Sequence, residues 1–322
     1  HRIKPEPEKP MQSADIPQSS AYPQKQEYRA PGEKITLSCK APVGSTVTVE
    51  FNGKTYKMTA GKSSHSSGLY AVTYTYTYTL PTYTGTSRVI DLGAPVYTMS
   101  YKGTTKTRKA PASIGVIMQG APYYAVVKSD STYTYRTTDT DGGGYHELHE
   151  GMTDSVTMLI GSFARLSNGQ YIQKASVNIT SEIAAPVIES AEYVPGEQWD
   201  ILKLKTTGLP AVYINSDGKA VTIHVSGGLK AGTPALPENT LFSSISAANK
   251  GTYTLYTLAL KNSRQLEGFI HEKTEQGLEI RFKHRVYAAK GDKPLVGITI
   301  MVDPGHGGAE TGAIGPLGLK YA

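Results

Sequence analysis

The feature that most constrains the fold is a strict two-residue alternation that runs from Tyr70 to Leu80. Apolar side chains, most of them tyrosine, hold one set of alternate positions, and threonine holds most of the other set. Successive side chains of a β-strand point to opposite faces, so the pattern predicts a strand with two different faces. The whole chain has 22 tyrosines, five phenylalanines and one tryptophan. Because tyrosine and threonine favour strands, we expect a mainly β protein in which the tyrosine face is core rather than a sugar-stacking surface.

The segment around this strand predicts an antiparallel sandwich. Ser45–Phe51 and Thr55–Thr59 alternate in the same way, and the Asn52-Gly53 pair between them is typical of a hairpin turn. Short strands at this spacing favour an immunoglobulin-like β-sandwich over residues 29–113. Cys39 is the only cysteine, which excludes an intrachain disulfide, and its place in an alternating run predicts a small buried side chain.

Composition limits the function classes. Residues 1–28 are rich in proline, glutamate, lysine and glutamine, which predicts an extended linker, and the start at His1 without a signal peptide predicts a processed chain. The formal charge of +6 is mild, and no cluster of basic and aromatic residues indicates a nucleic-acid partner. No apolar run approaches the ~20 residues that a membrane-spanning helix needs.

Residues 114–181 predict a small barrel, because several short strands alternate there with turn residues. Leu166-Ser167-Asn168-Gly169-Gln170 resembles the late hairpin of the bacterial Src-homology-three-like barrel. Tyr171-Ile172 stands where that family usually has a Gly-Trp pair.

Residues 182–297 predict a third β unit. Ala220–Val225, Tyr253–Leu260 and Leu278–Phe282 alternate as strands of an antiparallel sandwich do. The order of these strands, and their place ahead of the next segment, resembles the AMIN domain, a β-sandwich targeting module found ahead of cell-wall amidases. An unrelated antiparallel sandwich of the same length remains open as an alternative.

The last segment, residues 298–322, has a different pattern. Ile298–Asp303 is almost wholly apolar, which predicts a buried strand of an α/β sheet, and a glycine-rich loop follows it directly. In that loop His306 lies between Gly305 on one side and Gly307 and Gly308 on the other. Sites in α/β sheets form beyond the carboxyl ends of strands, where an imidazole can bind a metal and glycines let a ligand approach closely.

The string Val302–Gly308, followed by Gly312-Ala313-Ile314-Gly315, resembles the start of the zinc-dependent N-acetylmuramoyl-L-alanine amidase domain. The resemblance implies one Zn²⁺ held by His, Glu and His, with a further Glu as general base. It implies cleavage of the amide between N-acetylmuramic acid and the L-alanine of the stem peptide. The single ligand that maps onto this sequence is His306.

Two acidic residues near His306 receive supporting roles. Asp303 would orient the imidazole or the loop, and Glu310 is interpreted as a loop residue rather than the family's Glu ligand. The second His ligand and the catalytic Glu of the family have no counterpart in this sequence. A hydrolytic zinc needs three protein ligands and an open position, so we expect this chain alone to be inactive and to hold no zinc tightly.

A second group of histidines does not have the spacing of a known zinc motif. His146-Glu147-Leu148-His149-Glu150 is similar to the zincin helix motif, but its histidines are three positions apart instead of four. It also follows three glycines in a β region. We therefore interpret His146 and His149 as members of a solvated strand edge.

These observations predict a mainly β chain of antiparallel sandwich and small barrel modules in tandem, ending in the first strand of a truncated α/β domain. The expected function is the cell-wall-targeting region of a peptidoglycan amidase, located outside the cytoplasm, with peptidoglycan as partner and Zn²⁺ as the cofactor of the full-length parent. The alternative is a non-catalytic wall-binding or surface-adhesion protein that carries a remnant of the amidase start.

Overall fold

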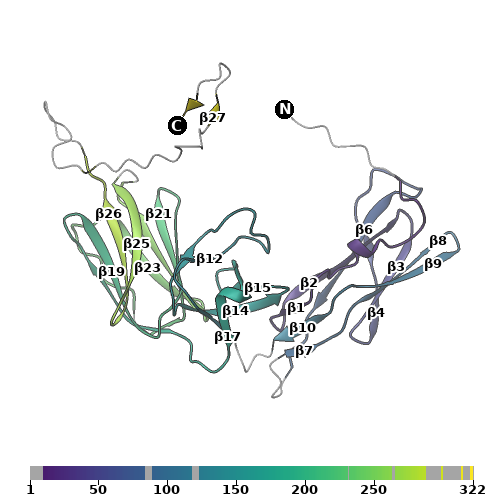
Figure 1. The fold of residues 1–322 in the computed structure, drawn as a ribbon, viewed down its shortest axis with the longest axis horizontal. Helices are drawn as coiled ribbons and strands as arrows, with labels where there is room; N and C mark the ends of the chain where they lie inside the picture. The colour runs from purple at the N-terminus through teal and green to yellow at the C-terminus, as the bar shows by residue number, and fades with distance from the viewer. Residues whose placement is uncertain are drawn as a thin grey trace.

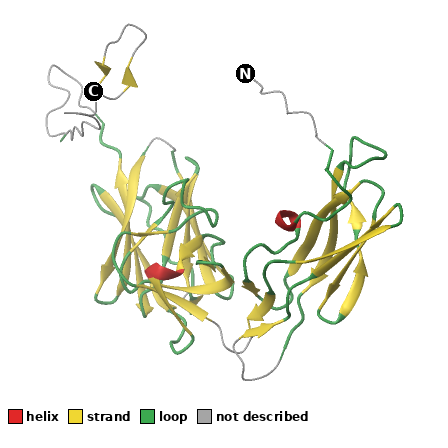
Figure 2. Ribbon diagram, turned by 45° about the vertical axis from the view of Figure 1, so that its right-hand side comes forward, coloured by secondary structure: helices red, strands yellow, loops and turns green. Residues whose placement is uncertain are grey.

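The computed structural model describes residues 10–83, 89–117, 123–230, 232–262 and 265–287, together with residue 299 and the backbone of 313–314 and 320–321. Strands dominate this part of the chain, and the helical elements in it are two short 3-10 turns, η1 (Gln18–Ser20) and η2 (Lys174–Ser176). Figures 1 and 2 show two bodies of strands that meet at one end. The fold is therefore mainly β, with several sheets in tandem, as the sequence predicts.

The first body is a two-sheet sandwich. One sheet has the order β2-β6-β5 and the other the order β4-β3-β8-β9. The strand bounds are β2 (Lys34–Pro42), β3 (Thr46–Phe51), β4 (Lys54–Lys57), β5 (Thr59–Ala60), β6 (Ala71–Thr79), β8 (Val96–Tyr101) and β9 (Thr104–Lys109). Alternate residues of β2 and β3 face inward and form the core with Tyr97 and Met99 of β8. Cys39 is buried there, as its position predicts.

The predicted linker over residues 1–28 is wrong for residues 10–28, since this segment packs on the first sandwich. Ile16 and Ala21 are completely buried in its core. The backbone of the segment is also fixed, because the Arg108 guanidinium donates to the Ile16 carbonyl oxygen and the Tyr97 hydroxyl donates to that of Tyr22. A proline-rich chain leaves many carbonyl groups free, and here side chains of the sandwich satisfy some of them.

The unit that the sequence predicts to be a small barrel follows the first sandwich in the chain, and we call it the barrel for short. Among the described residues, no strand pairing closes its sheet. Its strands are β11 (Tyr123–Val127), β14 (Thr153–Ile160), β15 (Phe163–Leu166), β16 (Tyr171–Gln173) and β17 (Val177–Thr180), with a small pair β12 (Thr132–Tyr133) and β13 (Glu147–Leu148) beside them. The predicted turn lies between β15 and β16, where Gly169 has a φ of +85°. That left-handed conformation costs glycine little.

One continuous sheet joins the first sandwich to the barrel, in the order β16-β15-β14-β1-β10-β7. The short strand β1 (Glu27–Arg29) pairs with β14 of the barrel on one side and with β10 (Ile114–Ile117) on the other, and β10 pairs with β7 (Val89–Asp91). Ile114 and Val116 belong to the core of the first sandwich, so β10 lies with that module and not with the barrel that was predicted to begin at residue 114.

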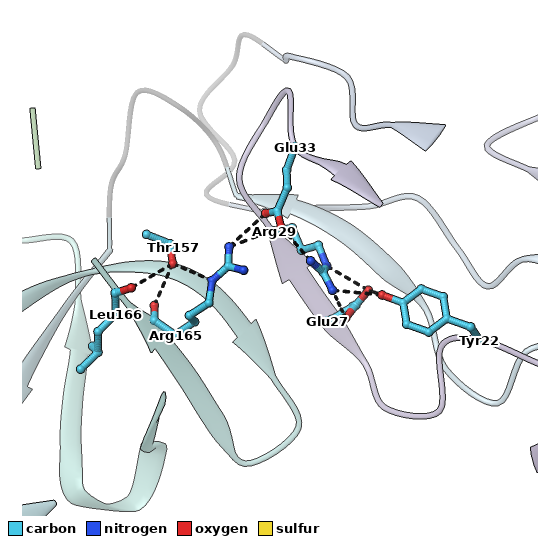
Figure 3. Close-up of polar contacts among 7 residues, drawn as sticks. All are labelled: Tyr22, Glu27, Arg29, Glu33, Thr157, Arg165 and Leu166. Atoms are coloured by element: carbon cyan, nitrogen blue, oxygen red, sulfur yellow. Dashed lines mark hydrogen bonds and ion pairs between the residues drawn. The ribbon is translucent and has the colours of Figure 1, made fainter. Parts of the chain in front are cut away.

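A chain of ion pairs reinforces this joint (Figure 3). Arg165 of the barrel binds Glu33 of the first sandwich at 3.2 Å, and Glu33 also binds Arg29 at 2.7 Å. Arg29 pairs in turn with Glu27, which is completely buried and accepts a hydrogen bond from the Tyr22 hydroxyl. The network thus links groups from both modules through side chains that water reaches only in part.

The second sandwich has the sheets β22-β18-β19-β26-β25 and β20-β21-β24-β23. Its strand bounds are β18 (Val187–Val194), β19 (Trp199–Thr207), β20 (Val212–Ser216), β21 (Ala220–Ser226), β22 (Gly228–Leu229), β23 (Phe242–Asn249), β24 (Tyr253–Leu260), β25 (Leu266–Thr274) and β26 (Gly277–His284). Its buried apolar residues and most of those of the barrel form one hydrophobic cluster. The barrel and second sandwich therefore share a core, while the first sandwich has its own.

The predicted α/β segment, residues 298–322, lies outside the described residues except for residue 299 and two short strands. These are β27 (Ala313–Ile314) and β28 (Lys320–Tyr321), which pair antiparallel.

Candidate functional site

The predicted zinc loop lies outside the part of the chain that the structure describes. Its residues are Asp303, Gly305, His306, Gly307, Gly308 and Glu310. Within the described ranges, no group of three or more His, Cys, Asp or Glu side chains could hold a metal ion.

Four histidines gather where the barrel meets the second sandwich. His146 contacts the Ile214 carbonyl oxygen of β20 at 3.2 Å, and His224 of β21 contacts the Ser167 hydroxyl of the barrel at 2.8 Å. The rings of His149 and His271 lie 5.2 Å apart, at one end of β13 and in β25 respectively. The strand predicted around residue 147 is confirmed, but its histidines are half-buried against another module instead of forming a solvated edge.

Burial and mutual repulsion lower the pKa of two of these histidines. The pKa of His271 falls to about 4, because burial disfavours its charged form and His149 lies close by. The pKa of His224 falls to about 4 as well, again through burial first and then through the nearby His146. Both rings are therefore neutral near pH 7. The cavity beside His271, of about 300 Å³, is lined also by Tyr145 and Ile270.

A buried carboxylate lies in the same interface. Asp154 of β14 is 2% exposed and accepts hydrogen bonds from the Tyr213 hydroxyl at 2.8 Å and from the backbone amides of Ser155 and Ser167. Burial raises the pKa of Asp154 to about 6, although these donors act in the opposite direction. Asp154 is not among the site residues predicted from the sequence. Its signal was an acidic side chain in the polar first half of the strand Thr153–Ile160, just before the more apolar half that ends at Ile160.

The strand from residue 71 to 79 has the two faces that the alternation predicts. Tyr74 is 2% exposed, and Tyr76 and Tyr78 are half-buried against the core of the first sandwich. Tyr76 stacks on Tyr56 with ring centroids 4.5 Å apart. The prediction that these tyrosines form core is confirmed, so they do not offer an open aromatic surface.

The opposite face of β6 belongs to an open hydroxyl-rich surface, which we name the threonine face. In this sheet Thr36 lies opposite Thr77, and Ser38 lies opposite Thr75, which in turn lies opposite Thr59. The full set is Lys34, Thr36, Ser38, Lys40, Thr59, Thr73, Thr75, Thr77 and Thr79. Seven of these nine residues are exposed, and Ser38 and Thr75 are half-buried.

Charge is divided unevenly between the two bodies. The described residues of 10–117 contain eleven Lys and Arg against five Asp and Glu. Those of 123–287 contain fourteen Lys and Arg against 17 Asp and Glu. The first sandwich is therefore basic and the other body mildly acidic, a contrast that the net charge of the whole chain hides.

Comparison with known proteins finds only remote structural similarity. No family model matches the chain, and no curated protein matches it. The N-terminal eight Ig domains of Down Syndrome Cell Adhesion Molecule match 81% of this chain at 13% identity and a TM-score of 0.20, and the chain covers 41% of their length. An I-band fragment of titin matches 79% of this chain and 93% of its own length, at 11% identity and a TM-score of 0.18. Similarity this remote has no bearing on function.

Among the described residues, no helix is both long and apolar enough to cross a membrane.

Proposed function

We propose that this chain is the wall-targeting region of an extracytoplasmic peptidoglycan amidase of the zinc-dependent N-acetylmuramoyl-L-alanine family. The observation that carries the proposal is the run Val302–Gly308 with its following Gly312–Gly315, which resembles the opening of that catalytic domain. The β modules ahead of it would hold the enzyme at the wall. Their AMIN-like and Src-homology-three-like character is part of the same proposal.

The zinc chemistry is assigned to the full-length parent and not to this chain. When bound, zinc in this family supplies a water activated for attack on the amide. Here His306 would be one ligand, and a single imidazole does not make a zinc site. Since the described residues offer no further cluster of ligands, we derive no catalytic step through the metal.

The connections between the modules support an anchoring role. The shared sheet fixes the first sandwich to the barrel, and the shared core fixes the barrel to the second sandwich. A stiff anchor keeps an attached catalytic domain near its polymeric substrate, which raises the effective substrate concentration.

The first prediction is that the purified chain sediments with insoluble peptidoglycan. The measurement is the bound fraction at low and at raised salt, beside a control protein of similar pI near 9.0. We expect enrichment over the control and only partial loss with salt, because the net charge is modest. Equal sedimentation of chain and control at low salt would contradict the anchoring role.

A further inference from the structure

The threonine face has seven hydroxyl groups. Among the described residues, none of these hydroxyls has a hydrogen-bond partner. The other sheet of the same sandwich differs, because there the hydroxyls of Thr98 and Thr107 bond to each other at 3.2 Å. A hydroxyl can both donate and accept, so a row of unpaired hydroxyls suits a ligand that also offers both.

The shape of the threonine face suits an extended ligand. Threonine is branched at Cβ and short, so its hydroxyl is held in few rotamers above the sheet and loses little freedom on binding. Lys34 begins β2, and Lys40 lies on the same face two residues before the strand ends at Pro42. At the rise of a β-strand they lie about 20 Å apart, which exceeds the length of a single sugar or phosphate group.

The charge of the threonine face is positive. Both lysines are exposed and have no ion-pair partner among the described residues, and the face contains no Asp or Glu. It belongs to the basic first sandwich and not to the acidic body. A negatively charged partner therefore meets attraction here without a carboxylate to repel it.

We propose that the threonine face binds a wall polymer made of polyol units joined by phosphate groups. Such a chain is extended, carries a negative charge in each repeat and offers hydroxyls between the charges, which matches two separated lysines with hydroxyls between them. Each exposed lysine contributes little alone, and many repeats along one polymer raise the overall affinity. The inference rests on the proposed function, since it names the wall component that the first sandwich recognises.

The test uses the full chain and two wall preparations from a Gram-positive bacterium. One is intact, and the other is stripped of its phosphate polymers with hydrofluoric acid. We expect the first to retain the chain and the second to retain several-fold less. Equal binding to both would overturn this inference while leaving wall targeting in place. Binding to neither would contradict the proposed function itself.

Two variants locate the binding on this face. Lys34→Gln with Lys40→Gln should bind intact walls about fivefold more weakly, the effect of two exposed ion pairs of ordinary strength, and with a smaller salt dependence. Thr36→Val with Thr77→Val keeps the branched shape, and should weaken binding without changing the salt dependence. Lys219→Gln with Lys250→Gln is the matched control on the second sandwich, where both lysines are exposed. Unchanged binding by the first or the second variant, or a loss equal to that of the control, would overturn the assignment.

Discussion

Two kinds of residue in one interface respond to pH in opposite directions. Burial raises the pKa of Asp154 to about 6. The protonated carboxyl group therefore stabilises the fold fully below the unfolded pKa near 4, and this stabilisation is lost as the pH rises through 6. Burial lowers the pKa of His224 and His271 to about 4. Their contribution is full above the unfolded pKa near 6.5 and is lost as pH falls through 4. The two effects oppose each other between pH 4 and 6.5.

Asp154→Asn should separate the two effects, because it removes the carboxylate and leaves both histidines. We compare the unfolding free energy of the variant with that of the parent chain at each pH. The difference should shift in favour of the variant by about 3 kcal/mol from pH 4 to pH 7, the equivalent of two pKa units. The measurement is urea unfolding followed by the fluorescence of Trp199, at a series of pH values. Parallel stability curves for the two proteins would show that Asp154 is ionised at the same pH in both the folded and unfolded states.

At the scale of elements, the joint between the first sandwich and the barrel depends on a position that only glycine fits. A Cβ atom at Gly115 in β10 would overlap the ring of Tyr28 in β1 and the backbone oxygen of Ile90 in β7. Because one of these contacts is backbone, a side-chain rotation cannot relieve it. A side chain at residue 115 would therefore push β10 away from β1 and β7 within the shared sheet.

Gly115→Val should loosen the joint at a cost of about 1–3 kcal/mol, the usual penalty for overpacking. We expect faster proteolysis between the two bodies and a larger radius of gyration by small-angle X-ray scattering. Gly142→Val is the control, since nothing lies within 4 Å of its added Cβ. If the two variants are cleaved at the same rate and have the same radius, the sheet does not hold the modules together.

The elements that could be predicted from sequence are those whose pattern is local. The run from Tyr70 to Leu80 alternates over a whole strand, so its two faces followed from the sequence. By contrast β1 is three residues long and gains its stability from partners far away in the chain, which no local pattern reveals. Proline content likewise predicted a linker, although tertiary contacts at Ile16 override that local preference.

The same limit applies to the candidate surfaces. The threonine positions of β6 were predicted to share a face, but their neighbours on β2 depend on a pairing register that the sequence does not specify. Asp154 was missed because its partners Tyr213 and Ser167 come from different modules. The roles of His306 and Asp303 stay predictions.

At the scale of the whole molecule, the proposed chemistry yields a two-part prediction. The chain alone should release no stem peptide from peptidoglycan with added Zn²⁺, because His306 is its only mapped ligand. In a longer form that carries the remaining ligands, His306→Ala should lower turnover at least about a hundredfold, since residues that merely orient a ligand already contribute 10- to 100-fold. His146→Ala is the control and should keep turnover. Release by the chain alone, or full activity of the His306 variant, would remove the zinc-ligand assignment.

The sheet that crosses from the first sandwich to the barrel also sets an order of events during synthesis. Glu33 and Arg165 are 132 positions apart in the sequence. The strand β1 can complete its pairing only after β14, from the same distant region, has been made. While the ribosome is still making the barrel, β1 of the emerging sandwich has no partner on the β14 side. An unpaired strand edge invites association with other nascent chains, so the first module is most exposed to aggregation before the second is complete.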